Sequence, residues 1–236
     1  MYAILLAGGK GTRLKPFTAT FPKPLVPLGD TPIIEVVVKQ LAHHGVRDVT
    51  VVTGHLAELI QAFLGTGSRY QLNIDYLKEE VPLDTAGCIG MIDRPDGPFF
   101  VMNGDILSTI DFSKLMAFHV REDVIATIAT CSRSVNIDFG VLEIGTHGEL
   151  QEYIEKPKHE YQVSMGVYCF SPRVCDYVKA GESIGMPDLI VRLRDAGEDV
   201  RCFQDPCYWL DIGRPEDYAR AAEEFCADPE KFIPAS

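Results

Sequence analysis

The stretch of the 236-residue chain with the clearest chemistry is a glycine-rich turn followed by two basic residues. Three glycines within residues 8–11 end an apolar run over residues 2–7, which has the composition of a buried parallel strand. Glycine permits positive φ angles and close approach of backbone N–H groups, so this turn can form a nest for phosphate oxygens. Arg13 adds a rigid fork of donors and Lys23 a point charge. The stretch therefore predicts a phosphate-binding loop.

Two better-known phosphate motifs do not fit this turn. A dinucleotide-binding fingerprint needs G-x-G-x-x-G, and from Gly9 the chain reads Gly-Lys-Gly-Thr-Arg-Leu, without the third glycine. A P-loop needs G-x-x-x-x-G-K-[ST], and the sequence contains no such run. A nicotinamide-dependent Rossmann enzyme is therefore disfavoured, and a P-loop protein is excluded.

Asp105 is the candidate metal ligand that the strand pattern itself indicates. It follows residues 98–102, a second buried apolar run. In open α/β sheets, ligands bind beyond the carboxyl ends of the strands, and Asp105 lies at such an end. Its carboxylate is a hard oxygen donor, placed where Mg²⁺ would bridge phosphates. An aspartate after a strand is also a common turn or capping residue, so the position alone leaves both interpretations open.

An alternation of strands and helices must position these residues. The predicted strands of the first half are residues 2–7, 48–53, 72–77 and 98–102. The first predicted helix opens with Thr31 as N-cap and Pro32 as first helical residue, and closes at Gly45. A second, amphipathic helix is expected over residues 55–64. This order predicts parallel βαβ units in a doubly wound sheet.

The pattern changes in the second half of the chain. Strands at residues 139–144, 153–154 and 162–170 follow one another without long helices, which predicts a small antiparallel insertion on the core sheet. The remaining predicted helices are 111–120, 171–180, 187–195 and 214–227, and the remaining strands are 123–131 and 200–204. The predicted fold class is α/β, a Rossmann-like doubly wound, mostly parallel sheet carrying this insertion.

The amino-acid composition limits which classes of binding partner are expected. The net charge of −12 argues against sequence-independent nucleic-acid binding, which needs a basic surface. No apolar run approaches the roughly 18 residues of a membrane span, so no membrane partner is expected. The seven cysteines are scattered without a C-x-x-C pair, and no signal peptide is recognisable. These features predict a globular protein of the reducing cytoplasm.

The glycine-rich string over residues 8–14, with Pro22-Lys23-Pro24, resembles the G-G-x-G-T-R-L…P-K-P signature of the sugar nucleotidyltransferases, or NDP-sugar pyrophosphorylases. Further motifs of that family follow in order at residues 78–87, 103–105, 155–157 and 208–218. The resemblance runs from residue 1 to about residue 220 and is most like the mannose-1-phosphate and heptose-1-phosphate guanylyltransferase branch. It implies the nucleotide-diphospho-sugar transferase fold and an Mg²⁺-dependent transfer from an NTP to a sugar 1-phosphate.

The resemblance also implies functional residues. The implied catalytic residues are Arg13, Lys23, Asp105 and Asp211, of which Asp105 and Asp211 are the metal ligands. The implied nucleotide-binding residues are Leu6, Ala7, Gly8, Gly9, Gly11, Thr12, Arg13, Lys23, Glu80, Pro82, Thr85, Ala86, Gly87, Asn103, Gly104 and Asp105. The implied sugar-phosphate residues are Gly140, Glu155, Lys156, Ser164, Gly166 and Asp211. One domain over residues 1–236 is expected, with 1–135 mainly for the nucleotide, 136–210 mainly for the sugar phosphate, and 211–236 for the second metal carboxylate and last helix.

Two local expectations concern loops of these motifs. Lys156 precedes a proline, which disfavours the helical region, so its backbone is expected to be extended. It could also be an ordinary exposed surface lysine. Thr85 is expected to cap the next helix while its loop lies against the nucleobase.

Substrate choice stays open at this point. GTP with mannose or heptose 1-phosphate is the main expectation, and Glu79 or Glu80 could accept hydrogen bonds from guanine, although a solvated acidic loop explains them equally well. Asp84, in place of the family's usual glycine, favours UTP, and thymidylyltransferases share the same framework. Ser164 replaces the usual asparagine. A catalytically silent nucleotide-sugar sensor is the alternative from another class, and a homodimer is among the expected partners.

Overall fold

The computed structural model describes residues 1–9, 11–14, 18 and 20–233. Its centre is a seven-stranded sheet in the order β12-β8-β11-β6-β1-β4-β5. The strands are β1 Tyr2–Leu6, β4 Asp48–Thr53, β5 Asn73–Lys78, β6 Phe99–Asn103, β8 Ala126–Asn136, β11 Lys158–Phe170 and β12 Val200–Gln204. Only β11 runs against its neighbours. The predicted α/β class with a mostly parallel sheet is therefore confirmed.

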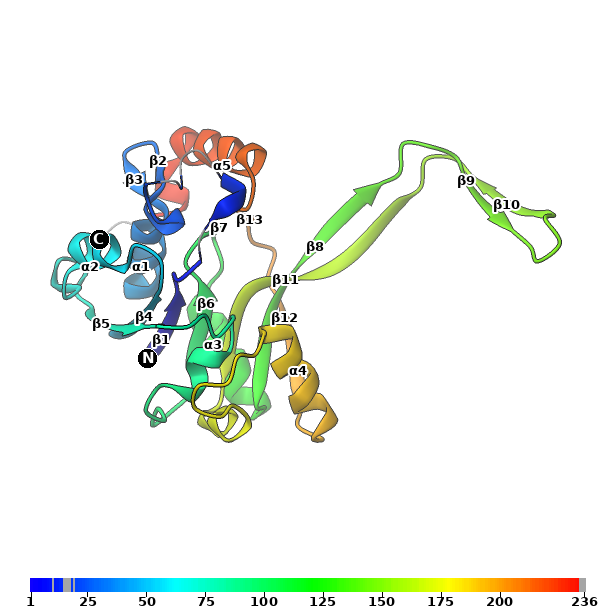
Figure 1. Cartoon of the computed structure of the whole chain (residues 1–236). Helices are drawn as coiled ribbons and strands as arrows, with labels where there is room; N and C mark the ends of the chain where they lie inside the picture. Colours follow the sequence, from blue (N-terminus) through cyan, green and yellow to red (C-terminus); the bar gives the residue numbers. More distant parts are fainter. Residues whose placement is uncertain (10, 15–17, 19, 234–236) are drawn as a thin grey trace.

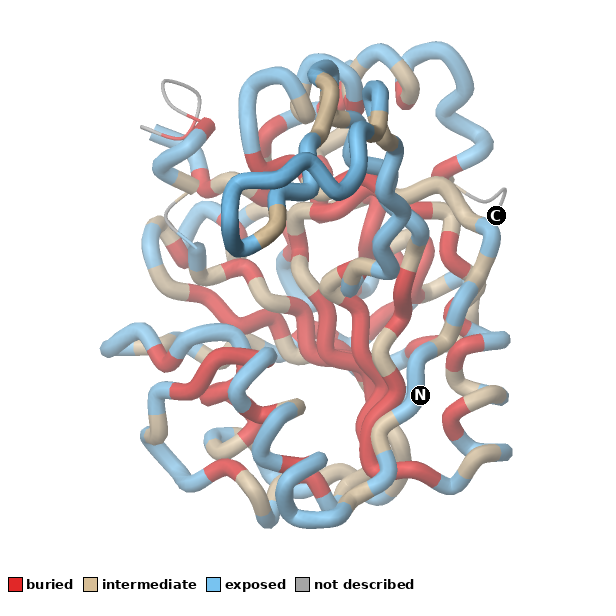
Figure 2. The backbone as a smooth tube through the Cα atoms, turned by 90° about the vertical axis from the view of Figure 1, so that its right-hand side faces the viewer, coloured by how far each residue is buried: buried red, intermediate tan, exposed pale blue. Residues whose placement is uncertain are grey.

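Helices cover both faces of this sheet, as a doubly wound fold requires. The helices are α1 Ile33–His43, α2 Ala57–Leu64, α3 Phe112–Glu122, α4 Met186–Asp195 and α5 Pro215–Ala227. Apolar side chains of α1, α2 and α3 pack with Ala3 and Leu5 of β1. Because successive side chains of a strand point to opposite faces, Ile4 packs on the other side with α4. Figure 2 shows the result as buried strands in the middle of the molecule.

A third apolar cluster joins the N-terminal turns to the C-terminal helix. It contains Leu14, Leu28, Ile212 and Phe225, each almost fully buried. Two small antiparallel ladders lie here: β2 Pro27–Leu28 with β3 Thr31–Pro32, and β7 Ile106–Ser108 with β13 Trp209–Asp211. The short 3₁₀ segments are η1 Thr12–Leu14, η3 Lys23–Leu25, η4 Ser68–Tyr70, η5 Gly87–Gly90, η6 Pro172–Tyr177 and η7 Pro229–Lys231. This cluster holds distant parts of the chain against one end of the sheet.

The second-half insertion is antiparallel, as predicted, but it does not lie on the core sheet. The ladder of β8 and β11 continues past the body, and β9 Val141–Ile144 pairs with β10 Leu150–Ile154 at its far end. Figure 1 shows this extension, residues 132–163, projecting away from the rest of the protein. We call it the arm. β12 pairs with β8 only at the root of that strand, and β6 pairs with β11 only at its root, so no strand of the described residues extends the sheet beside the arm.

Several local predictions were wrong. Thr31 does not cap α1: it lies in β3, and the first helical N–H, that of Ile33, donates to the Val26 carbonyl. Residues 171–180 form only the 3₁₀ segment η6, and the strand predicted from residue 123 begins at Ala126. Thr85 caps no helix beside it, because Ala86 precedes η5 without any side-chain cap. None of the helices in the described part of the chain has the length and hydropathy that a membrane crossing would need.

Candidate active site

A pocket of about 370 Å³ lies at the carboxyl end of the central strands. It is lined by Leu6, Gly8, Gly9, Arg13, Val52, Glu79, Pro82, Asp84, Thr85, Asn103 and Asp105. The last residues of β1 and β6 contribute Leu6 and Asn103, and β4 contributes Val52. This is the crevice where the strand order reverses around β1, the position at which open α/β sheets bind ligands. A larger hollow of about 690 Å³ lies at the opposite end of these strands, around Met1 and Pro98, and contains no residue of the sequence motifs.

The glycine turn is held in shape from two sides. A side chain at Gly54, after β4, would meet the Gly8 carbonyl oxygen at 2.9 Å, so the loop after β4 comes this close to the turn only with glycine at position 54. Gly11 has φ +58°, and the Thr18 hydroxyl donates a 2.7 Å hydrogen bond to its carbonyl. The chain then enters η1, whose Leu14 is buried and whose Arg13 stays exposed at the pocket. The turn therefore aims one guanidinium at the space above β1.

The β7–β13 ladder brings the two predicted metal ligands together across more than a hundred residues of chain. Asp211 is paired with Ile106, the residue after Asp105, and the N–H of Ile212 donates a 3.2 Å hydrogen bond to the Asp105 carbonyl. Lys23 forms an ion pair with the Asp105 carboxylate. All four predicted catalytic residues thus lie at one end of the sheet.

Electrostatics supports this proximity. Burial raises the pKa of Asp211, and the neighbouring Asp105 carboxylate raises it further, whereas Lys23 and Arg13 lower it. Two carboxylates and two cations therefore act on one another in a partly desolvated space. Their charges nearly balance before any substrate is present.

The residues present fit a divalent cation. Asp105 and Asp211 offer hard oxygen donors, and the mutual repulsion that raises the Asp211 pKa is what a divalent ion would relieve. The described residues contain no group of three or more His, Cys, Asp or Glu side chains that could hold a metal. Mg²⁺ is commonly held by one or two carboxylates together with substrate phosphates, so two protein ligands are sufficient.

The acidic loop after β5 forms the other wall of the pocket. Glu79 follows β5 directly, and its Oε1 atom is buried with no hydrogen-bond partner among the residues the structure describes. Burial raises the pKa of Glu79, a hydrogen bond from the Leu83 backbone lowers it, and Asp84 raises it. A buried acceptor without a partner costs free energy, so it is a candidate ligand contact.

Asp84 and Thr85 have local structural roles. Asp84 has φ +61°, the left-handed conformation that glycine adopts easily and aspartate tolerates, and its carboxylate accepts a 2.7 Å hydrogen bond from the Thr85 N–H. The Thr85 hydroxyl accepts a 2.7 Å hydrogen bond from the N–H of Met186, the first residue of α4. Thr85 thus ties this loop to a helix a hundred residues further along the chain.

Some predicted nucleotide residues lie outside the pocket. Glu80 is exposed and does not line it, so of the two neighbouring glutamates it is Glu79 that lines the pocket. Ala86 is fully buried in the core, and a side chain at Gly87 would meet the Glu182 carbonyl oxygen at 2.4 Å. Ala86 and Gly87 therefore support the loop from behind. Ala7, Gly11, Thr12 and Gly104 do not line the pocket but are close chain neighbours of residues that do, and Lys23 contacts the lining residue Asp105.

Three lining residues are not among the nucleotide-binding residues that the resemblance implies: Val52, Glu79 and Asp84, although Glu79 is one of the two glutamates expected as possible guanine acceptors. Val52 and Glu79 lie at the carboxyl ends of the second and third predicted strands, the signal that indicated Asp105. Asp84 had been considered only as a departure from a family motif.

The root of the arm adds two predicted sugar-phosphate residues beside the pocket. Gly166 has φ +70°, and a side chain there would meet the Asn103 amide nitrogen at 2.5 Å. Ser164 and Tyr168 share a 2.9 Å hydrogen bond between their hydroxyls. The indole N–H of Trp209 donates a 2.8 Å hydrogen bond to the Met165 carbonyl, which ties β13 to this strand.

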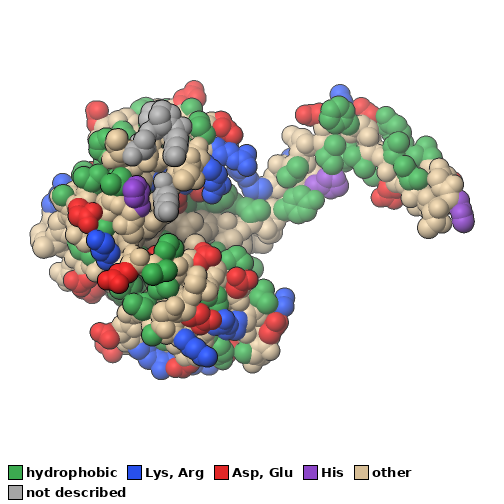
Figure 3. Space-filling model, viewed as in Figure 1, with side chains coloured by type: hydrophobic (Ala, Val, Ile, Leu, Met, Phe, Trp, Pro, Cys, Tyr) green, Lys and Arg blue, Asp and Glu red, His purple; other side chains and the backbone are tan. Residues whose placement is uncertain are grey.

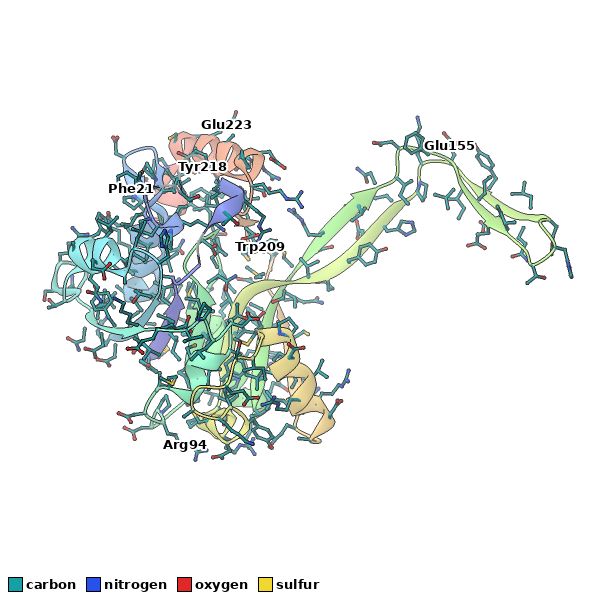
Figure 4. The ribbon with its side chains drawn as sticks, viewed as in Figure 1. Phe21, Arg94, Glu155, Trp209, Tyr218 and Glu223 are labelled. Atoms are coloured by element: carbon teal, nitrogen blue, oxygen red, sulfur yellow. The ribbon has the colours of Figure 1, made fainter. Side chains whose placement is uncertain are left out.

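The other three predicted sugar-phosphate residues are not brought to the pocket. Gly140, Glu155 and Lys156 lie on the arm, and Figure 4 shows Glu155 far out on it while Trp209 lies in the body. Lys156 has φ +45°, so the expectation of an extended backbone was wrong. The chain bends at Glu155 and Lys156 between β10 and β11, and this bend overrides the local effect of Pro157.

The chain matches the nucleotidyl transferase family over residues 2–228. It belongs to that family. It is 31% identical to a mannose-1-phosphate guanyltransferase of Yarrowia lipolytica, with 100% of this chain and 68% of that protein covered. It is 32% identical to a UTP–glucose-1-phosphate uridylyltransferase of Synechocystis, with 94% and 62% covered. These relatives are sugar-1-phosphate nucleotidyltransferases, and this chain spans about two thirds of their length.

Solved structures agree on the fold. A putative glucose-1-phosphate thymidylyltransferase from Bacillus anthracis superposes with a TM-score of 0.76 at 24% identity, with 95% of this chain and 94% of that chain covered. The protein HddC from Yersinia pseudotuberculosis gives a TM-score of 0.72 at 26% identity, with 95% and 99% covered. HddC has also been solved with GMP-PN.

Proposed function

We propose that this protein transfers a nucleotidyl group from GTP to a sugar 1-phosphate, most simply mannose or heptose 1-phosphate, and releases pyrophosphate. The observation that carries the reaction class is the convergence of Arg13, Lys23, Asp105 and Asp211 at the end of β1. The family membership of the chain supports the same reaction.

The proposed step is one displacement at phosphorus. A phosphate oxygen of the sugar 1-phosphate attacks the α-phosphorus of the NTP, the bond from that phosphorus to the bridging oxygen breaks, and pyrophosphate leaves with the electron pair. Such transfers are catalysed mainly by positioning and by neutralising charge. The N–H groups of the glycine turn bind the triphosphate, Arg13 holds the departing pyrophosphate, and Lys23 stabilises charge at the α-phosphate.

Asp105 and Asp211 would hold Mg²⁺ in this proposal. When bound, the ion would neutralise phosphate charge that the two cations of the pocket cannot offset alone. Lys23 pairs with Asp105 in the structure described here, so its amine would have to move toward the phosphate when the nucleotide enters.

The unpaired oxygen of Glu79 supports guanine as the base. Guanine presents two adjacent donors on its Watson–Crick edge, whereas uracil and thymine each present one, so a free acceptor oxygen on this wall has more donors to pair with in guanine. Asp84 no longer argues for UTP, because its backbone conformation explains why a residue that tolerates the left-handed region stands there. UTP and dTTP remain the competing substrates, and a silent nucleotide-sugar sensor remains the competing class. The cytoplasm is the proposed compartment, consistent with seven free cysteines.

The deciding experiment measures pyrophosphate release from GTP, UTP, dTTP, CTP and ATP, each with mannose, glucose and heptose 1-phosphates, in Mg²⁺ and in EDTA. We expect one dominant, EDTA-sensitive pair containing GTP. Turnover with UTP or dTTP instead would overturn the base assignment. No turnover, with nucleotide still raising the melting temperature, would replace the enzyme with the sensor.

A further inference from the structure

The three predicted sugar-phosphate residues that lie outside the pocket are close together on the arm. We call this part of the arm, residues 137–140 and 153–157, the elbow. The N–H of Ile137 donates a 3.1 Å hydrogen bond to the Pro157 carbonyl, which joins its two strands. A side chain at Gly140 would meet the Tyr153 hydroxyl at 2.4 Å, so the ring lies against this glycine. Gly140, Glu155 and Lys156 thus lie in one local unit, and this unit does not reach the pocket of its own chain.

The arm holds the elbow away from that pocket. β8 and β11 are paired continuously from Thr130 with Ser164 to Asn136 with Lys158. At about 3.3 Å per residue, this ladder carries the elbow roughly 20 Å outward. Folding back would require bending or breaking the ladder, because its hydrogen bonds run along the whole length.

The arm also lacks the cover that a β-hairpin needs. A two-stranded hairpin is marginally stable in water unless another surface covers it. Among the described residues, seven of the fourteen exposed large hydrophobic side chains are on the arm: Val135, Phe139, Leu142, Ile144, Leu150, Tyr153 and Tyr161. Phe139, at the elbow, is 78% exposed. Figure 3 shows hydrophobic side chains along this projection.

We infer that the arm docks on a second copy of this chain and that its elbow completes the pocket of that copy. The inference rests on the proposed function. A second copy is the occupant that supplies both missing parts: an apolar cover for the arm, and a pocket that needs the charged elbow. In a two-fold dimer the exchange is reciprocal, so each pocket receives the partner's Lys156 beside its own Arg13 and Lys23. The positive φ of Lys156 is consistent with a bend set by this docking.

Sedimentation tests the docking without any substrate. The wild-type chain is expected to be a dimer, and Phe139→Glu is expected to shift it to the monomer because it puts a charge into the covered surface. Val120→Glu is the matched control, since Val120 is 58% exposed on α3, away from the arm. A monomeric wild type, or a dimer that Phe139→Glu does not weaken, overturns the inference whatever the enzyme's activity.

Mixed dimers test the shared site. Lys156→Ala and Asp105→Asn chains are co-expressed with different affinity tags, and the dimer carrying both tags is purified. If the elbow acts on the partner, one complete site forms and about half of the wild-type turnover returns. If it acts on its own chain, neither site is complete and turnover stays at the level of the single variants, which overturns the shared site.

The reciprocal mixed dimer is the control. It pairs the wild-type chain with the doubly substituted chain carrying Lys156→Ala and Asp105→Asn. Exchange across the dimer leaves no complete site, so turnover is lost, whereas action within one chain leaves half of it. If the wild type has no activity with any substrate pair, the proposed function fails, and sedimentation still decides the docking.

Discussion

The body sheet and the inner part of the arm, formed by the outer halves of β8 and β11, belong to one continuous sheet, yet they differ in what fixes their side chains. β6 is buried at four of its five residues, with helices on both faces. The outer halves of β8 and β11 are exposed on nearly every residue, although they continue the same ladder. Packing therefore fixes the pocket residues at the ends of the body strands, whereas on the arm only the ladder itself sets the positions.

The two regions also divide the proposed chemistry. The body provides the residues for the nucleotide and its phosphates, at the end of β1. The arm provides Gly140, Glu155 and Lys156, which the sequence motifs relate to the second substrate. In the proposed dimer, the body of one chain would hold the nucleotide residues in fixed positions. The docked arm of the other chain would bring its sugar-phosphate residues to the same site.

The largest expected effect concerns the body. Asp105→Asn or Asp211→Asn should lower kcat by about 10³-fold, because each removes one of two carboxylates that would hold the metal opposite the phosphates. Pyrophosphate release against Mg²⁺ concentration measures this. Asp93→Asn, an exposed acid of the opposite hollow, should leave the rate unchanged. Full activity of either variant at saturating Mg²⁺ would remove the metal assignment.

The next effect concerns the arm. Lys156→Ala should lower kcat/KM for the sugar 1-phosphate by about 10²-fold and leave KM for GTP unchanged, because the lysine serves only the second anion. Lys158→Ala is the matched control, since Lys158 is an exposed lysine two residues further along the same arm. An unchanged kcat/KM in Lys156→Ala would make Lys156 an ordinary surface lysine and confine the chemistry to the body.

The base-facing wall of the body pocket should show a smaller, selective effect. Glu79→Gln should lower kcat/KM for GTP by about 10- to 100-fold and affect UTP less, because it removes an ionised acceptor for guanine. Burial raises the pKa of Glu79, so as the pH is lowered this carboxylate is protonated earlier than an ordinary glutamate. The affinity for GTP should therefore begin to fall at a higher pH. Glu80→Gln, next along the chain and exposed, is the control. A uniform loss for all nucleotides would end the guanine assignment.

How much the sequence could predict differs between the same two regions. In the body, apolar runs predicted β4 over its full observed length and the ends of the other early strands to within about one residue. This worked because a parallel strand that is buried on both faces has an almost continuous apolar sequence. The proximity of Asp105 and Asp211 was different. It depends on the small ladder of β7 and β13, which no local pattern predicted, and only the family resemblance indicated it.

On the arm, the succession of strands without long helices between them predicted antiparallel strands correctly but not their path. Whether a hairpin lies on a sheet or projects from it depends on surfaces outside the hairpin, which local pattern does not encode. Lys156 shows the same limit at one residue: the proline rule predicts extended backbone, and the bend of the whole arm requires positive φ. The sequence indicated both Glu79 and Glu80 as acidic residues near the end of a strand. Only the burial of the Glu79 side chain in the structure shows which of the two lies at the pocket.

The same substitution should have different consequences in the two regions. Gly87→Ala places a methyl group 2.4 Å from the Glu182 backbone oxygen in the body, which should cost about 2 kcal/mol and lower the melting temperature by roughly 4–8 °C. Gly140→Ala meets the end of the Tyr153 side chain, which is 60% exposed and can swing away, so the change should stay under about 0.5 kcal/mol. Thermal unfolding of both variants makes the comparison. A larger loss at Gly140 would indicate that the Tyr153 side chain cannot move away from the added methyl group.

A further expected effect on stability is an acid sensitivity located in the body, where α3 packs on the root of β8. His119 is 2% exposed, and its Nδ1 lies 2.8 Å from the Thr127 hydroxyl. Burial lowers the pKa of His119 to about 4, so between pH 6.5 and 4 the unfolded chain binds a proton that the folded chain does not. Stability should therefore fall as the pH drops through this range, by ~1–3 kcal/mol for this one group. Denaturant unfolding at a series of pH values measures the slope, which should flatten in His119→Gln and persist in His159→Gln, whose histidine is exposed on the arm. A slope that instead disappears with His159→Gln would place the acid-sensitive contact on the docked arm rather than in the body.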